Sequence, residues 1–361
     1  MTTALFLLFV VLFVVLAFEY INGFHDTANA IATVVSTKVL TPRQALVLAA
    51  GMNLVGAFFG QAVAKTIHSG LVDDKIVAVT TLTVFCAMLG GIIWNLLTWW
   101  FGMPSSSTHA LVGGLIGASL AAAKGNWNVL IWSRVKPDGK VEGIYHKVVI
   151  PMITSPLLGL TVGFVVMGLL FLMIRNWRPS TVNSTFGRLQ ILSAGYMGFG
   201  HGLADAQKTM GVIMLTLFGA TAAGDLDGLP SWLGFLRIED KSASIPTWIV
   251  ITCALVMAAG TYAGGWRIIK TLGHKMVKMK PVHGFAAETT AATILAATGA
   301  MGMPVSTTHT ITTSIMGVGA AKRANAIQWS LVEQIVWAWV MTIPATGILG
   351  YLIYKICGLF A

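Results

Sequence analysis

The sequence predicts an all-α integral membrane protein with about 10–12 transmembrane helices, some of them broken or re-entrant, arranged as two inverted-topology repeats. Three observations predict this fold class: the composition, the length of the apolar runs, and a polar octapeptide that occurs twice. Of the 361 residues, 56% are hydrophobic and only 10% are charged. This balance excludes an ordinary soluble domain, in which about a quarter of the residues are charged.

Apolar runs long enough to cross the hydrocarbon core occur throughout the chain. One helical crossing needs about 20 predominantly apolar residues. The first run continues into Glu19 instead of a cleavage site with small residues, and no basic segment precedes it, so we expect it to remain in the mature protein. The runs cover residues 4–18, 44–63, 76–101, 148–174, 248–265 and 335–360.

The octapeptide GMPSSSTH at 102–109 returns as GMPVSTTH at 302–309. A polar segment precedes each copy, GFHDTANA from Gly23 and GHGLADAQKTMG from Gly200. Each half therefore has a polar break, apolar spans and then an octapeptide. With five spans expected in the first half, the second half enters the membrane from the opposite side. Interrupted helices at matching positions of such inverted repeats mark a transporter's binding site.

This pattern divides the chain into a first inverted repeat at 1–174, a cytoplasmic linker at 175–188 and a second inverted repeat at 189–361. Basic residues cluster in the linker and at 267–280, which the positive-inside rule places in the cytoplasm. The net charge of +10 therefore reflects membrane topology, and no nucleic-acid partner is expected. We expect a multi-pass protein of the cytoplasmic (cell) membrane, in contact with lipid.

Each octapeptide has the residues of a helix start that binds an anion. Proline is tolerated in the first turn of a helix, where hydroxyl side chains lie beside free backbone N–H groups and the positive end of the helix dipole. Such hydroxyls can instead bond back to their own helix, but two copies at matching positions favour anion binding. The expected anion ligands are Ser105, Ser106, Ser107, Thr108, Ser306, Thr307 and Thr308.

Asp26 and Asp205 lie in the two polar segments that precede the octapeptides. An acid inside a membrane segment is costly and indicates a function. Because carboxylates repel a nearby anion unless a cation lies between them, we expect Asp26 and Asp205 to bind a coupling cation or metal, or to carry protons. Glu19, Glu288, His25 and Asn29 are further candidates for this coupling, and Asn29, Gln207 and Lys208 are further candidates for binding the anion.

An enzymatic function is less favoured, and no resident cofactor is expected. Ser105 or Ser106 could approach His109 as in a hydrolase, but duplication of the whole unit suits a symmetric binding site better than one nucleophile, so we expect no enzyme. Cys86, Cys253 and Cys357 lack the spacing of disulfides or metal sites, and no resident cofactor is expected.

At these motifs the chain resembles the inorganic phosphate transporter family. The family's first signature, with the pattern Gly-Ala-Asn-Asp-x-Ala-Asn-Ala, is similar to residues 23–30, and the Lys-Val-Leu-Thr stretch that follows it matches Lys38–Thr41. The second signature, His-Gly-Ala-Asn-Asp-x-Gln-Lys, is similar to residues 201–208. Both segments of the form Gly-x-Pro-x-Ser-x-Thr-His are present as well. The resemblance extends over both halves.

The resemblance implies symport of inorganic phosphate with a proton or a sodium ion, or transport of a metal-phosphate complex. It implies that the Ser/Thr octapeptides and the two broken helices hold phosphate, and that acids and amides bind cations. It also implies a homodimer and an elevator-like or rocking movement. The Asn of each signature is replaced, by His25 and by Ala204. These departures count against sodium coupling, and His25 could carry a proton near neutral pH.

The expected function is thus a secondary active phosphate symporter that alternates access around a midplane anion site. A sulfate or related oxyanion permease on the same scaffold is the nearest alternative, because hydroxyl and backbone donors alone do not separate two tetrahedral anions. A passive anion channel is less favoured, since it needs no paired acids.

Overall fold

The structure is a computed structural model that describes residues 3–69, 71–73, 76, 79–135, 139, 141–240, 244–323, 325 and 327–359. The helices are α1 (Thr3–Ser36), α2 (Pro42–Gly56), α3 (Ala62–Ser69), α4 (Thr81–Phe101), α5 (Ser107–Ala122), α6 (Ile150–Ile174), α7 (Pro179–Ala222), α8 (Thr247–Ala263), α9 (Trp266–Lys270), α10 (Pro281–Ala300), α11 (Thr307–Lys322) and α12 (Trp329–Cys357). Four shorter helical turns are η1 (Trp127–Val129), η2 (Tyr145–Val149), η3 (Ser231–Leu236) and η4 (Thr271–Lys275). Strands β1 (Arg134–Val135) and β2 (Val141–Glu142) form one antiparallel pair.

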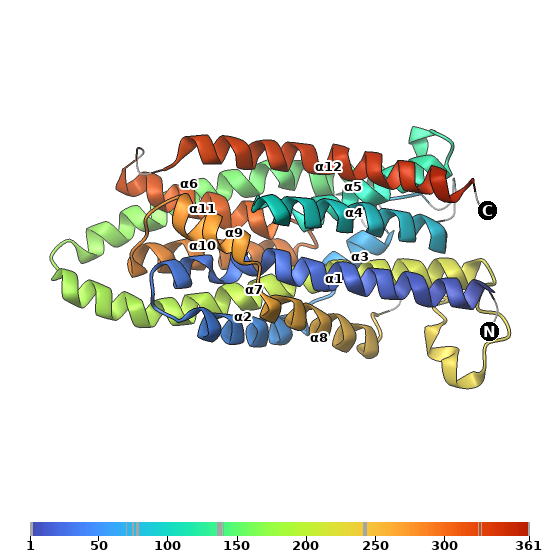
Figure 1. Ribbon diagram of the computed structural model, residues 1–361, viewed down its shortest axis with the longest axis horizontal. Coiled ribbons are helices and arrows are strands. Elements are labelled where there is room, and N and C mark those ends of the chain that lie inside the picture. The colour runs from blue at the N-terminus through green and yellow to red at the C-terminus, as the bar shows by residue number, and fades with distance from the viewer. Residues whose placement is uncertain are drawn as a thin grey trace.

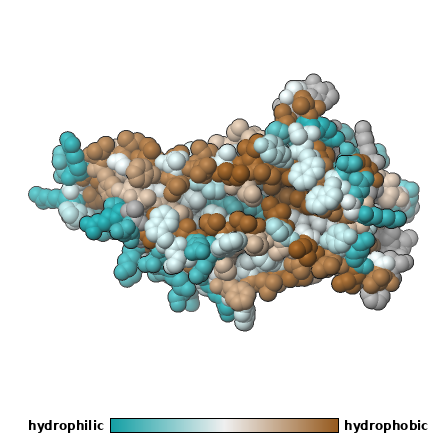
Figure 2. All heavy atoms as spheres, turned by 90° about the horizontal axis from the view of Figure 1, so that it is seen from above, coloured by the Kyte–Doolittle hydropathy of each residue, from teal (hydrophilic) through white to brown (hydrophobic). Residues whose placement is uncertain are grey.

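The all-α membrane class is confirmed. In the described part of the chain, four helices are long and apolar enough to cross a bilayer, and the pair α8 and α9–η4, bent by 58°, adds a fifth. The four are Leu5–Ser36, Thr81–Phe101, Tyr145–Ile174 and Trp329–Cys357. The remaining helices are shorter or more polar, as expected for re-entrant segments and for helices that line a site. Figure 2 shows hydrophobic side chains over much of the body and hydrophilic ones gathered toward its two ends.

The helices run along the long axis of the molecule, and corresponding helices of the two halves point in opposite directions (Figure 1). The first residues of α1 and the last of α12 lie at the same end, and the turn between α6 and α7 lies at the other. Helices α1 and α7 run in opposite directions, as do α6 and α12. The pair α4 and α5 enters from the end that holds the termini and turns back near the middle. The pair α10 and α11 enters from the other end in the same way.

Helices of each half also pack on helices of the other half. Helix α1 packs on α8 while α7 packs on α2, and α5 packs on α12 while α11 packs on α6. Glycines make two of these contacts close. A Cβ added at Gly117 would lie 1.8 Å from the carbonyl oxygen of Gly347 on α12, and one at Gly317 would lie 2.1 Å from that of Leu160 on α6. The last two helices of each half are therefore held by backbone contact to the other half.

Gly317→Val is expected to disrupt the packing of α11 on α6. The added side chain would meet a backbone carbonyl and not a flexible side chain. The loss in the free energy of unfolding should therefore exceed the roughly 1–3 kcal/mol that is usual for overpacking. Thermal unfolding of the purified variant in detergent measures the loss. Gly168→Val on α6 is the control, because a Cβ there meets nothing within 4 Å. Equal stability of the two variants would contradict this account of the interface.

Candidate functional site

Two non-helical links, 103–106 and 303–306, lie in the middle of the molecule, where α4 gives way to α5 and α10 to α11 (Figure 1). The glycine before each link is left-handed, with φ of 67° at Gly102 and 64° at Gly302. Glycine adopts this conformation without the cost that a side chain adds. Each link can therefore end one helix and start the next within a few residues.

The helices after the two links begin in the same way. The Ser106 hydroxyl accepts a hydrogen bond from the backbone N–H of His109 at 3.2 Å, and the Ser306 hydroxyl accepts one from that of His309 at 3.2 Å. Each serine is an N-cap. A cap satisfies one of the four N–H groups that have no partner within the helix, so further donors and the positive end of the dipole remain available at each start.

The two helix starts are in contact with each other. The Thr108 hydroxyl donates to the carbonyl oxygen of Val305 at 3.3 Å, and the ring centroids of His109 and His309 are 4.8 Å apart. The expected anion ligands of both octapeptides are 3% exposed or less. These residues are Ser105, Ser106, Ser107, Thr108, Ser306, Thr307 and Thr308. The repeated motif thus builds one enclosed polar centre.

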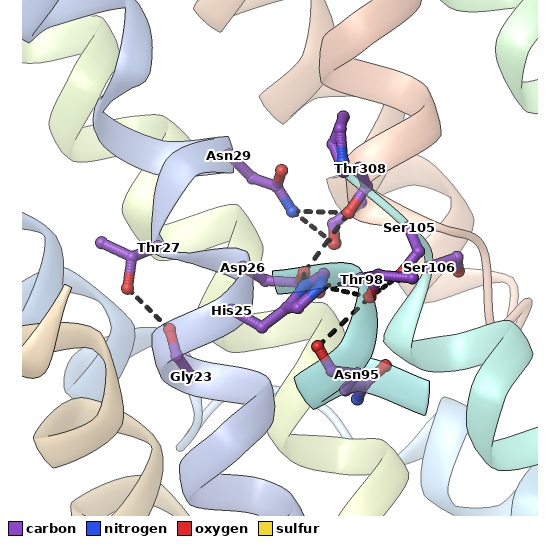
Figure 3. A network of polar contacts seen from close by, with 12 residues as sticks. Gly23, His25, Asp26, Thr27, Asn29, Asn95, Thr98, Ser105, Ser106 and Thr308 are labelled. Carbon is purple, nitrogen blue, oxygen red and sulfur yellow. Dashed lines mark hydrogen bonds and ion pairs between the residues drawn. The ribbon is translucent and has the colours of Figure 1, made fainter. Parts of the chain in front are cut away.

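Helix α1 contributes Asp26 and Asn29 to this centre. The Asn29 amide donates to the hydroxyls of Thr307 at 3.2 Å and Thr308 at 3.0 Å. Thr308 in turn donates to a carboxylate oxygen of Asp26 at 3.4 Å. Figure 3 shows Asp26 and Asn29 reaching from α1 toward Thr308. The first polar segment is therefore bound to the octapeptide of the second half.

Helix α7 makes the reciprocal contact. The Lys208 ammonium group donates to the Thr108 hydroxyl and to the Asp205 carboxylate. The other Asp205 oxygen accepts from the Thr307 hydroxyl at 3.2 Å. In both halves, the residue three positions after the aspartate contacts the other half's helix start, and it is Asn29 in one case and Lys208 in the other.

The two aspartates come together at the junction of α1 and α7. Oxygens of Asp26 and Asp205 and a ring nitrogen of His201 all lie within 4.8 Å of one another, and all three side chains are buried. His201 Nε2 is 3.2 Å from Asp205, one helical turn away. His201 was not among the expected site residues, although its position four residues before Asp205 was a usable signal.

His25 joins Asp26 to the first octapeptide. Its Nδ1 lies 2.7 Å from an Asp26 oxygen, and its Nε2 lies 3.1 Å from the Thr98 hydroxyl and 3.4 Å from that of Ser105. The hydroxyl oxygens of Thr98 and Ser105 are themselves 2.8 Å apart, and both side chains are drawn in Figure 3. Thr98 could not be chosen from the sequence, because it lies in an apolar helix seven residues before Ser105.

One expectation about the backbone is wrong. The polar segments that contain Asp26 and Asp205 do not break their helices, since α1 and α7 are continuous through them. Hydroxyl groups at the start of α11 form hydrogen bonds with Asp26, Asn29 and Asp205, so these side chains find partners while the backbone keeps its own hydrogen bonds. The actual interruptions lie in the octapeptides and at Gly264–Gly265 between α8 and α9.

Gln207 does not join the centre in this structure. Its carbonyl oxygen accepts from the backbone N–H of Val63 at 3.0 Å, near the start of α3, and its amide donates to the Leu203 carbonyl at 2.7 Å. A role in binding the anion remains a prediction for Gln207.

Glu19 and Glu288 lie on opposite sides of the centre. Glu19 accepts a hydrogen bond from Thr209 of α7. Glu288 of α10 accepts from Thr33 of α1, and also from Ser193 and Gln190 of α7. Glu19 is seven residues before Asp26 on α1, and Thr33, which contacts Glu288, is seven residues after it. Seven helical residues span roughly 10 Å, so the two acids lie on either side of Asp26 along α1.

The enclosed site, the interrupted helices and the apolar exterior define a membrane transporter. The sequence profile of the phosphate transporter family matches residues 22–182 and 174–350, and the chain belongs to this family. Its members and the relatives named below are transporters, so the chain is a multi-pass membrane transporter of the phosphate class and not an enzyme.

Three similar proteins carry the name "Probable low-affinity inorganic phosphate transporter". The protein of Rhizobium meliloti (strain 1021) is 43% identical, covering 96% of both chains. That of Mycobacterium tuberculosis (strain ATCC 25618 / H37Rv) is 41% identical, covering 98% of this chain and 78% of the relative. That of Bacillus subtilis (strain 168) is 38% identical, covering 99% and 98%. A solved structure titled "The sodium-dependent phosphate transporter" shares the fold, with a TM-score of 0.80 at 21% identity, covering 98% of this chain and all of the other.

Proposed function

We propose that this chain is a secondary active symporter of inorganic phosphate in the cytoplasmic membrane, driven by protons or sodium. The observation that carries the proposal is the meeting of two capped helix starts with two buried aspartates and Lys208. Helix starts and an ammonium group attract an anion, and carboxylates attract a cation. The two charges therefore stabilise each other only when both ligands are bound, which is the physical basis of coupling.

Phosphate would be held by the free N–H groups and hydroxyls of both octapeptides, by Asn29 and by Lys208. Thr307 and Thr308 now donate to the aspartates and accept from Asn29, so an entering anion would exchange these contacts for its own. Hydroxyls and an amide can reorient for such an exchange without moving the backbone.

The coupling cation would lie between Asp26 and Asp205. Carboxylate and hydroxyl oxygens suit sodium or a divalent metal that travels with phosphate, and the His25–Asp26 and His201–Asp205 pairs suit protons. Lys208 already balances one of the two buried negative charges. One further positive charge is therefore enough to neutralise the pair of aspartates.

The aspartates also favour phosphate over sulfate. At neutral pH, hydrogen phosphate carries a hydroxyl that can donate to a carboxylate, whereas sulfate has only acceptor oxygens. A buried carboxylate beside the anion therefore accepts a hydrogen bond from phosphate and repels sulfate. Competition of labelled phosphate uptake by excess sulfate tests this point, and strong competition would instead support the oxyanion permease.

Access would alternate between the two sides of the membrane, because the expected anion ligands of the octapeptides and both aspartates are buried. The opposed directions of α1 and α7 and the exchanged packing support two inverted repeats, 1–174 and 189–361, joined by the linker 175–188. Glu19 and Glu288 would be cation or proton relays on the two sides. The homodimer expected from the family remains a prediction that mass photometry in detergent can check.

Uptake of labelled phosphate into proteoliposomes, under proton and sodium gradients imposed one at a time, tests the proposal. We expect accumulation above the external concentration under at least one gradient. Equilibration without accumulation under both gradients would favour a passive anion channel.

Thr307→Ala is expected to raise the apparent KM for phosphate about ten-fold or more, because a hydrogen bond to a charged group contributes roughly 1.5–3 kcal/mol. Initial uptake rates over a range of phosphate concentrations measure the change. Thr293→Ala is the matched control, since this threonine is exposed and its hydroxyl donates to the Thr289 carbonyl of its own helix. Unchanged kinetics in Thr307→Ala would remove the hydroxyls from the anion site.

A further inference from the structure

A basic hollow lies outside the central site, at the end of the molecule opposite the termini. It has a volume of about 680 Å³ and lies between the chain that leads into α10 and the link from α11 to α12. A hydrogen bond of 3.1 Å from the Gln328 backbone N–H to the Met276 carbonyl joins these two segments. The volume falls in the range of about 300–1,000 Å³ that is typical of small-molecule sites.

The lining is strongly cationic. It includes His274, Lys275, Lys278, Lys322 and Arg323 around a buried floor that contains Met276 and Val277. The lysines and the arginine are exposed, and among the described residues no ion pair joins them to an acid. Neither 274–280 nor 322–330 contains an Asp or Glu. Four permanent positive charges around one concave surface therefore lack internal compensation.

The positive-inside rule places this end in the cytoplasm, where the inner leaflet is negatively charged. Hydrophilic side chains gather at this end of the molecule (Figure 2). An apolar floor beneath a cationic rim fits a ligand that combines phosphate oxygens with a less polar part, and lysine and arginine are the residues that bind phosphate groups.

We propose that this basic hollow is a second phosphate-group site, distinct from the transport site. Its ligand is either the headgroup of an anionic phospholipid or a free compound with several phosphate groups. The site is not an extension of the central one, because α11 begins at Thr307 in the centre and ends at Lys322 in the hollow, roughly 22 Å away along the helix. A ligand in the hollow thus contacts the far end of the helix whose start faces the anion.

The test compares two triple variants. Lys278→Gln/Lys322→Gln/Arg323→Gln removes charge from the hollow, and Arg175→Gln/Arg178→Gln/Arg188→Gln removes the same charge from exposed positions at the same end of the molecule. One arm titrates delipidated protein in nonionic detergent with tripolyphosphate by calorimetry. The other counts phosphatidylglycerol molecules that remain bound, by native mass spectrometry, after reconstitution in mixed phosphatidylglycerol and phosphatidylcholine vesicles.

The hollow variant is expected to lose affinity on the order of 100-fold, since each basic residue near an anionic surface contributes about five-fold. The control variant should stay close to the native protein. A loss in the lipid arm alone assigns the site to phospholipid, and a loss in the tripolyphosphate arm alone assigns it to a free phosphate compound. Equal binding by the two variants in both arms would overturn the proposal. Phosphate uptake in phosphatidylcholine vesicles checks that both variants are folded.

Discussion

Asp26→Asn is expected to abolish concentrative phosphate uptake while leaving membrane insertion intact. Asparagine keeps the size of the side chain and can still accept a hydrogen bond from Thr308, but it cannot supply the negative charge that holds a cation beside the anion. Asp205→Asn should have the same effect, with an additional loss of stability because Lys208 then lacks its partner. Loss of one partner of a buried pair costs about 3–5 kcal/mol.

Uptake into proteoliposomes under a proton or a sodium gradient measures the effect. We expect the rate of concentrative uptake to fall at least about 100-fold, which corresponds to the free-energy cost of breaking a buried ion pair. Asp227→Asn, at an exposed acid in the turn after α7, is the control and should transport normally. Near-native accumulation by both site variants would remove the acids from the mechanism. The Asp26→Asn variant is decisive if Asp205→Asn does not fold.

Lys208→Gln should impair both stability and transport. The ammonium group contacts Asp205 and Thr108 at once, so glutamine leaves a buried carboxylate without its cation and frees the helix start of α5. The expected destabilisation is about 3–5 kcal/mol, and the apparent KM for phosphate should rise because one positive charge is lost beside the anion.

Thermal unfolding and uptake kinetics of the same Lys208→Gln preparation separate the two effects. Lys124→Gln, at an exposed lysine just after α5, is the matched control and should resemble the native protein in both measurements. If Lys208→Gln kept native stability and a native KM, Lys208 would be neither the partner of Asp205 nor an anion ligand.

Much of the site could be predicted because duplication makes a local signal specific. One Ser/Thr-rich helix start is common in membrane proteins, but two copies 200 residues apart identified the residues that meet in the structure. The same comparison of halves picked out Asp26 and Asp205 as a matched pair of candidate ligands. These predictions required only matching positions, and no knowledge of how the helices pack.

Contacts between different helices could not be predicted in this way. Thr98 and Asn29 acquire their partners only through packing, and the Gln207 amide bonds to the backbone near α3 instead of the anion centre. The expectation that polar segments break α1 and α7 failed for the same reason. Neighbouring helices provide hydrogen-bond partners for buried side chains, so no backbone break is required.

The glycine contacts at Gly117 and Gly317 limit how the protein can move. Where two backbones touch, sliding by a fraction of an ångström meets steep repulsion, so we expect α5 to travel with α12 and α11 with α6. Each of these pairs takes one helix from either half of the sequence. The rigid parts that open and close the pathway are therefore chimeras of the two halves, and a crosslink within a half reports on motion better than one across these pairs.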